Sequence, residues 1–306
     1  MFKSLTKNDK YAHYGFLFVL PFFIIMAIFI IYPILNTIYL SFTVWEGATI
    51  PPKWVGLQNY LRLFKEIKEG GIFLQSIKNT WILWICNVIP QFVGALALAV
   101  LLTDKHNKIK GKEFFRAIFY LPNIITMASI AALFSFLLGW PHGAINDILV
   151  GLNILKEPFY FLQNVWATRL SISTILTWMW FGYTMIIFMA GIKAIPEELF
   201  EAARVDGASK WQTFKSVTLP QLRSIMTYQV VTSIIGGLSM YDLPQVLTNG
   251  TGAPLNSVTT MVMYIYRQGF SNYSLGYASA VAIGLFLHIL VVVAIFLKFI
   301  NKKEDY

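Results

Sequence analysis

The sequence predicts an all-α membrane protein with six membrane-spanning helices. Of its 306 residues, 57% are hydrophobic and only 13% are charged, and the mean hydropathy is positive. Six stretches lack Asp, Glu, Lys and Arg, and each holds or nearly holds the ~20 apolar residues that cross ~30 Å of hydrocarbon. A water-soluble helical protein would have to bury all six stretches and would have almost nothing left to face water.

The six helices are expected near residues 15–40, 79–102, 117–138, 170–192, 224–247 and 277–298, in a single membrane domain over residues 1–306. The first follows a basic head, as in a signal peptide. Its apolar run is too long and no small-residue cleavage site follows, so we predict a retained helix. The fifth is the least regular, because Asp242 and Pro244 interrupt it.

Lys and Arg residues predict the orientation of the chain. Sixteen of the 24 lie in the two termini and in the loops after helices two and four, and eight lie in the other loops. By the positive-inside bias, both termini are expected in the cytoplasm. The net charge of +9 is accounted for by these flanks, so no nucleic-acid partner is needed.

The outer loop "VGLQNYLRLFKEIKEGGIF" predicts an amphipathic helix between the first two spans. Its apolar residues recur at helical spacing, and two glycines end the pattern; the face comprises Leu57, Tyr60, Leu61, Phe64 and Ile67. We expect this helix to lie on the bundle, and its alternative position is the membrane interface.

Residues that carry chemistry are scarce. The chain has no G-x-x-x-x-G-K-[ST] phosphate loop and no H-E-x-x-H metal pair, and Cys86 is its only cysteine. The four histidines, His13, His106, His142 and His288, lie in different segments. No catalytic residue, metal site or cofactor is therefore predicted.

A proton-coupled carrier usually keeps several ionisable groups at membrane depth, and only Asp242 and His288 qualify here. For His288, a hydrogen bond to a neighbouring helix is the simpler interpretation. Asp242 is open to either a structural hydrogen bond or a contact with a transported solute.

The segment from Pro196 to Pro220 predicts a helix-turn-helix elbow between the fourth and fifth spans. Pro196 suits a first helical position, Gly207 can end the helix in the left-handed conformation, and Ser209 with Gln212 has the spacing of a capping box. Leu219-Pro220 is expected to close the second helix. A plain connector would be polar, whereas large apolar residues are expected on the surface here: Leu199, Phe200, Val205, Trp211 and Phe214.

The elbow resembles the signature cytoplasmic loop of permease subunits of binding-protein-dependent ABC importers. The matching residues are Glu201-Ala202-Ala203, Gly207, Val217 in place of the commoner Ile, and Leu219-Pro220. The segments "VGLQNYLRLF", "FYLPNIITMASIAALFSFLL", "YDLPQVLTNGTGAP" and "YIYRQGFSNYSLGYASAVA" extend the resemblance to the carbohydrate, maltose-importer-like branch over nearly the whole chain. "TNGTGAP" departs from the family's more frequent T-x-G-G-P run.

The resemblance implies a subunit of the bacterial cell membrane that imports a sugar or oligosaccharide. It implies a second permease subunit, here a different chain, two cytoplasmic ABC ATPases and an external sugar-binding protein. The elbow would rest in a cleft of the ATPase, with Gly207 allowing the turn and Glu201 pairing with basic or backbone groups. The alternatives are an ion-coupled secondary transporter of a small polar solute and an intramembrane enzyme.

A sugar path through an apolar bundle needs hydrogen-bonding groups and aromatic faces. Helices three to five offer candidates, with two glycines leaving room for a bulky ligand; each residue alone could instead serve helix packing. The candidates are Asn123, Trp178, Tyr183, Gln229, Ser233, Gly236, Gly237 and Tyr241.

Overall fold

The computed structural model describes residues 12–47, 51–104 and 110–301. In these ranges, five helices are long and apolar enough to cross a membrane, or six if one sharply bent pair counts as a single span. The termini and segment 105–109, which entered the orientation count, lie outside the described residues, as do His106 and the side chain of His13. The chain divides into two compact units, residues 1–65 with 265–284 and residues 66–264 with 285–306.

The first unit begins with one long span, Leu17–Ser41. Helix α1 (Ala12–Met26) passes through a π-helical turn at Ala27–Ile31 into α2 (Tyr32–Ser41). The wider turn accommodates Pro33, which has no N–H to give to the helix. None of the residues in its most apolar stretch is buried.

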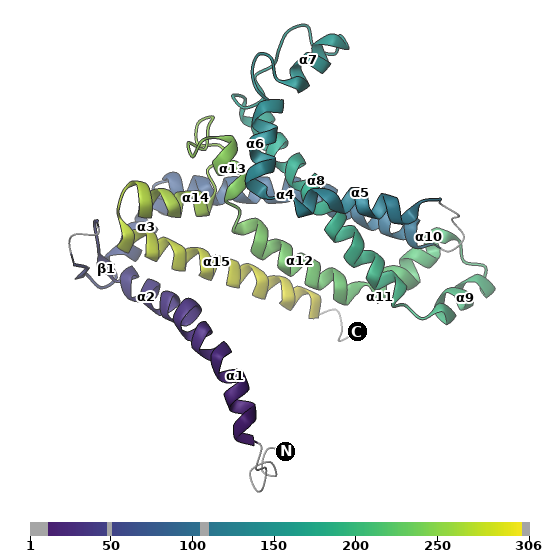
Figure 1. Cartoon of the computed structure of the whole chain (residues 1–306), viewed down its shortest axis with the longest axis horizontal. Coiled ribbons are helices and arrows are strands. Elements are labelled where there is room, and N and C mark those ends of the chain that lie inside the picture. The colour runs from purple at the N-terminus through teal and green to yellow at the C-terminus, as the bar shows by residue number, and fades with distance from the viewer. Residues whose placement is uncertain (1–11, 48–50, 105–109, 302–306) are drawn as a thin grey trace. The chain divides into compact units, whose positions relative to one another are not determined.

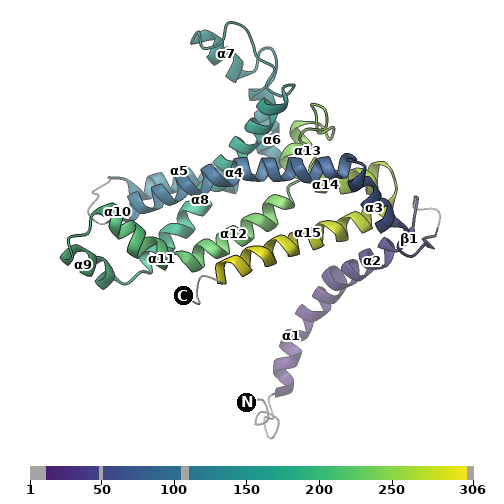
Figure 2. The ribbon, with the colours of Figure 1, turned by 180° about the vertical axis from the view of Figure 1, so that it is seen from behind.

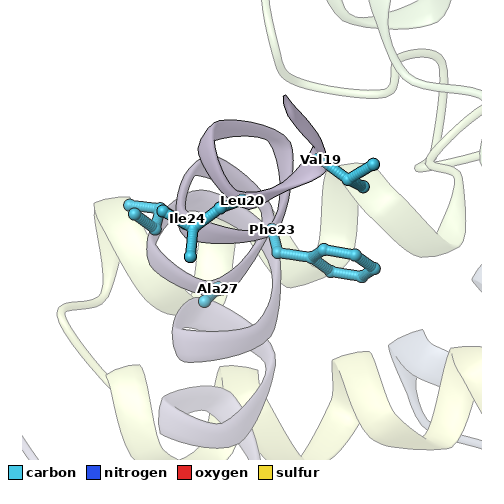
Figure 3. Close-up of a pocket in the computed structure, with 5 residues that line it drawn as sticks. All are labelled: Val19, Leu20, Phe23, Ile24 and Ala27. Atoms are coloured by element: carbon cyan, nitrogen blue, oxygen red, sulfur yellow. The ribbon is translucent and has the colours of Figure 1, made fainter. Parts of the chain in front are cut away.

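A shallow groove of about 300 Å³ runs along α1 (Figure 3). Its walls are the aliphatic and aromatic side chains of Val19, Leu20, Phe23, Ile24 and Ala27. Because these side chains offer no donor or acceptor, the groove has no means of recognising a polar solute.

Beyond α2, strands β1 (Thr43–Val44) and β2 (Lys53–Trp54) form an antiparallel pair. Helix α3 (Gln58–Lys68) confirms the helix predicted between the first two spans. Within the first unit, its buried face carries Asn59, which donates to the carbonyls of Ser41 (2.9 Å) and Thr43 (2.8 Å), and Leu63. Leu57, Leu61 and Phe64 are each more than 60% exposed, and whether this face lies on the bundle or in the membrane interface stays a prediction.

The second unit is built around two long helices, α4 (Ile72–Thr103) and α8 (Val165–Lys193), which lie side by side in both ribbon views (Figures 1 and 2). Helix α5 (Lys112–Ile124) packs against α8. Gly182 makes this approach possible, because a Cβ there would collide with the backbone of Phe119. Helix α12 (Arg223–Leu238) packs against both α4 and α8.

The third predicted span is not one helix. Helix α5 ends at Ile124, and α6 (Met127–Leu137) leaves at an angle of 94°. Ile125 and Thr126 are extended, and the Thr126 hydroxyl accepts from the N–H of Ser129 at 3.3 Å. A new N-cap thus starts inside an apolar run, which hydropathy alone cannot reveal.

The fifth span is interrupted, as Asp242 and Pro244 suggested. Helix α12 ends at Leu238 and α13 (Asp242–Leu247) follows it, packing against α6. Between α6 and α8 lies the short α7 (Ala144–Gly151).

Helix α4 begins seven residues before the predicted start at Asn79. Its first turns are polar because they hold the loop that follows α13. Asn79 donates to the carbonyls of Asn256 (2.7 Å) and Thr259 (3.2 Å), and Thr80 accepts from the N–H of Met261. The loop leads into α14 (Met261–Tyr266), a π-helical turn at Arg267–Ser271 and the last helix, α15 (Leu275–Asn301).

Candidate functional sites

A cavity of about 400 Å³ opens in the second unit between α4, α6, α8, α12 and α13. Its lining combines aromatic rings with neutral hydrogen-bonding groups. Six of the eight residues predicted for a substrate path line it together: Tyr183, Gln229, Ser233, Gly236, Gly237 and Tyr241.

The other two predicted residues lie elsewhere. Trp178 packs edge-on against Phe134, with ring centroids 5.8 Å apart, and Asn123 is in the last turn of α5; neither lines the cavity. Trp178 is two positions from Trp180, which does line it. Two residues turn a helix by about 200°, so Trp178 faces away.

Sequence reasoning missed the contribution of α4. Trp84, Asn87 and Gln91 all line the cavity. Gln91 is buried and donates from Nε2 to the Thr184 hydroxyl of α8 at 2.7 Å, and Thr177 of α8 donates to the Asn87 carbonyl at 3.1 Å. The sequence did offer a signal for this contribution, because an Asn and a Gln four positions apart lie on one face of an otherwise apolar helix.

The two glycines of α12 have different surroundings. A Cβ on Gly236 would meet nothing within 4 Å, so this glycine does leave open space. A Cβ on Gly237 would collide with the indole of Trp84, whose Nε1 donates to the Ser233 carbonyl at 3.0 Å and lies 3.1 Å from its hydroxyl. Gly237 therefore makes room for Trp84 rather than for a ligand.

Charge is scarce in the cavity. Asp242 is the only Asp, Glu, Lys or Arg among its lining residues, and it lies in the first turn of α13, where a carboxylate is favoured by the helix dipole. Tyr183 and Tyr228 both line the cavity, and the rings of Trp180 and Tyr183 meet edge to face with centroids 6.0 Å apart. Such a surface suits a neutral, hydroxyl-rich solute.

The elbow consists of α9 (Glu197–Val205), a turn and a second helical segment. Pro196 is the N-cap rather than the first helical residue. Gly207 has a φ of +74°. Its N–H donates to the carbonyl of Arg204, and the N–H of Ala208 donates to the carbonyl of Ala203. This is the hydrogen-bond pattern of a Schellman turn, for which glycine is favoured.

The second segment starts at α10 (Lys210–Thr213) with the predicted capping box: Ser209 accepts from the N–H of Gln212, whose side chain accepts from the N–H of Ser209 at 2.7 Å. Leu219-Pro220 does not close it. A π-helical turn at Phe214–Thr218 leads into α11 (Leu219–Gln221), so the segment stays helical until α12. The wide turn tolerates the missing N–H of Pro220.

The apolar residues of the elbow are partly exposed. Val205 is 88% and Trp211 70% exposed, and Leu199 is exposed to a smaller extent. Phe200 and Phe214 are half-buried, and the ring of Phe214 stacks on that of Trp211 with centroids 5.4 Å apart. Glu201 and Ala202 are exposed, Ala203 and Leu219 are half-buried, and Pro220 is exposed.

Comparison with known proteins identifies the family. Residues 81–305 match the model of the binding-protein-dependent transport system inner membrane component. The chain belongs to this family. It is 30% identical to a lactose transport system permease protein of Rhizobium radiobacter, with 95% of this chain and 94% of the relative covered. It is 31% identical to a multiple sugar-binding transport system permease protein of Streptococcus mutans, with 95% and 97% covered.

Among solved structures, a bacterial ABC transporter involved in alginate import has a similar fold, with a TM-score of 0.77, 24% identity and coverage of 95% of this chain and 96% of that one. The family member described here is therefore a multi-pass transport permease of an ABC importer and not an enzyme. Membership sets aside the two alternatives, an ion-coupled carrier and an intramembrane enzyme.

Proposed function

We propose that the permease carries a sugar or oligosaccharide through the cavity between α4, α8 and α12. One observation carries the proposal: the lining joins aromatic faces with amide and hydroxyl groups and holds one carboxylate, Asp242. Sugars offer hydroxyl groups to hydrogen-bond and C–H faces to stack on rings. The names of the lactose and multiple-sugar relatives support the same substrate class.

We propose further that both termini lie in the cytoplasm of a bacterial cell and that the permease works beside a second, different permease. Two ATPases would bind on the cytoplasmic side, and an external binding protein would deliver the sugar. The distribution of Lys and Arg supports the orientation. The span Leu17–Ser41, whose most apolar stretch is unburied, offers surface for a second subunit as well as for lipid.

The elbow is proposed as the contact with the ATPase. Val205 and Trp211 present large apolar surfaces on either side of the turn at Gly207, and exposed apolar groups of this size favour protein contacts. Leu199, Phe200 and Phe214 would add to the adhesion, and Glu201 would pair with a basic or backbone group. ATPase closure would then reach the helices as a rigid movement of the elbow.

Copurification tests the assembly and the elbow together. A tagged permease isolated in mild detergent should bring an ATPase and a second permease, and Gly207→Asp should lose the ATPase and uptake while the chain stays in the membrane. A Cβ added at Gly207 meets no atom within 4 Å, but the positive φ (+74°) strains any side chain there, so the control must carry the same backbone strain.

Gly70→Asp is the matched control, because Gly70 also has positive φ (+76°) and open space around its Cβ position. It should keep the ATPase. Normal uptake by Gly207→Asp would refute the docking role, and recovery of the chain alone from cells that still import sugar would refute the proposed assembly.

A further inference from the structure

Helix α15 contributes no residue to the cavity lining, yet it is linked to the cavity through His288. The imidazole Nε2 accepts a hydrogen bond from the indole N–H of Trp81 on α4, at 3.1 Å. The two rings are nearly perpendicular, with centroids 6.1 Å apart. The neighbouring-helix hydrogen bond expected for His288 is thus confirmed, and it fixes the orientation of an indole.

Trp81 in turn supports a wall of the cavity. Its ring meets that of Trp84 edge to face, with centroids 5.4 Å apart and planes at 85°. Trp84 lines the cavity, covers Gly237 and donates to Ser233. An unbroken series of contacts therefore runs from α15 through two indoles of α4 to α12.

We infer that His288 is a positioning residue for the solute cavity: by holding Trp81, it keeps Trp84 folded back over Gly237 and so keeps the cavity wide. The inference rests on the proposed function only in naming the solute as a sugar. The position of Trp84 is a property of the chain itself, and it can be measured without any solute.

The expected consequence of losing His288 follows from the packing on the two sides of Trp84. A leucine at 288 leaves the Trp81 N–H without its acceptor, and a part-buried donor then seeks another partner. Trp84 loses its edge contact when Trp81 turns. Gly237 and α12 block one side of Trp84, whereas the cavity is open on the other, so the ring should swing into the cavity and narrow it.

A single-cysteine reporter tests this in the assembled transporter held in nanodiscs. Cys86 is the chain's only cysteine, so Cys86→Ala with Gly236→Cys leaves one thiol in this chain, at a position where an added Cβ meets open space, and labelling is measured on the isolated band of this chain. His288→Leu should slow labelling of this thiol by a bulky maleimide by at least about twofold, as expected for residues coupled in one network. Labelling by a small methanethiosulfonate should stay the same.

His288→Gln is the rescue variant, because its side-chain oxygen can accept from Trp81, and it should restore labelling by the maleimide. Leu290→Ala, an exposed position on the same helix, controls for loosening of α15 and should leave both rates unchanged. Equal rates in His288→Leu and the parent, or no rescue by glutamine, would overturn the inference.

Tryptophan emission gives a second readout that holds even where the thiol reacts with neither reagent. His288→Leu should shift the emission, His288→Gln should not, and the shift should shrink in a Trp84→Phe background. An unshifted spectrum in His288→Leu would overturn the inference.

Sugar uptake separates the two proposals. If the His288 variants show the expected labelling pattern but the parent transporter imports no sugar, the proposed function alone is refuted. If the parent imports sugar but the variants do not show the pattern, the role of His288 alone is refuted.

Discussion

The elbow and the cavity are held in opposite ways. The turn and the N-cap of the elbow are shaped by hydrogen bonds between residues at most five positions apart, in the turn from Ala203 to Ala208 and the capping box of Ser209 with Gln212. The cavity is shaped by contacts between segments about 90 to 150 positions apart, such as Gln91 with Thr184 and Trp84 with Ser233. The elbow can therefore move as a unit, whereas any shift between α4, α8 and α12 alters the cavity.

The largest expected effect would break the cavity side of this comparison. Gly182→Ala places a Cβ against the backbone of Phe119, so α5 must move away from α8. Overpacking of this kind costs about 1–3 kcal/mol, and uptake should fall with stability. Thermal unfolding of the purified transporter measures the loss of stability.

Gly236→Ala is the control for Gly182→Ala, because it adds the same methyl group within a membrane helix but into open space. It should not lower the unfolding temperature, because alanine is favoured over glycine inside a helix by about 0.5–1 kcal/mol. Equal unfolding temperatures for both variants would contradict the close approach of α5 and α8.

The next effect concerns the buried pair within the cavity wall. Thr184→Val removes the acceptor of Gln91, and both residues are buried, so the free energy of unfolding should drop by about 1–3 kcal/mol for the unsatisfied amide. Adding Gln91→Leu should recover part of the loss, because both partners are then apolar. A double-mutant cycle of unfolding measures this, and strictly additive losses would show that the two side chains do not interact.

The same contrast explains what the sequence could predict. Gly207, Ser209 and Gln212 act through local hydrogen bonds, and their roles in the turn and the cap were predicted from spacing. Several residues predicted for a substrate path line the cavity, since Tyr183 and Gln229 lie on helices where polar residues stand out; their contact with a substrate stays a prediction.

What failed depended on long-range packing. Trp178 was chosen by residue type, but the rotation of α8 turns it away from the cavity. Trp84 and Gln91 were overlooked because α4 reads as an apolar span, and only its packing against α8 and α12 gives their side chains a common cavity. The bend at Ile125 and Thr126 was hidden within one hydrophobic run.

A smaller effect is expected at the elbow itself. Ser209→Ala removes the hydroxyl that accepts from the N–H of Gln212, and loss of an N-cap costs about 1 kcal/mol. Because the bond is local, amide exchange should speed up in residues 210–213 and not in α8. Faster exchange in α8 as well would show that the elbow is not independent of the bundle.

The smallest effect tests the one ion pair found between the elbow and α4 in the described part of the chain. Lys210 Nζ lies 3.0 Å from Asp104 Oδ2, and the Lys210 side chain is 78% exposed. An exposed pair contributes about 0.2–1 kcal/mol and is screened by salt, so Lys210→Gln should lower stability slightly at low ionic strength and not at high ionic strength.

Arg204→Gln is the matched control for coupling between the elbow and α4, because it removes only an ion pair within the elbow, with Glu197. If the elbow is joined to α4 through Lys210, only Lys210→Gln should make ATPase activity in the assembled transporter more sensitive to salt. Identical salt profiles for both variants would mean that movement of the elbow reaches the bundle only through the helical connection from α11 into α12.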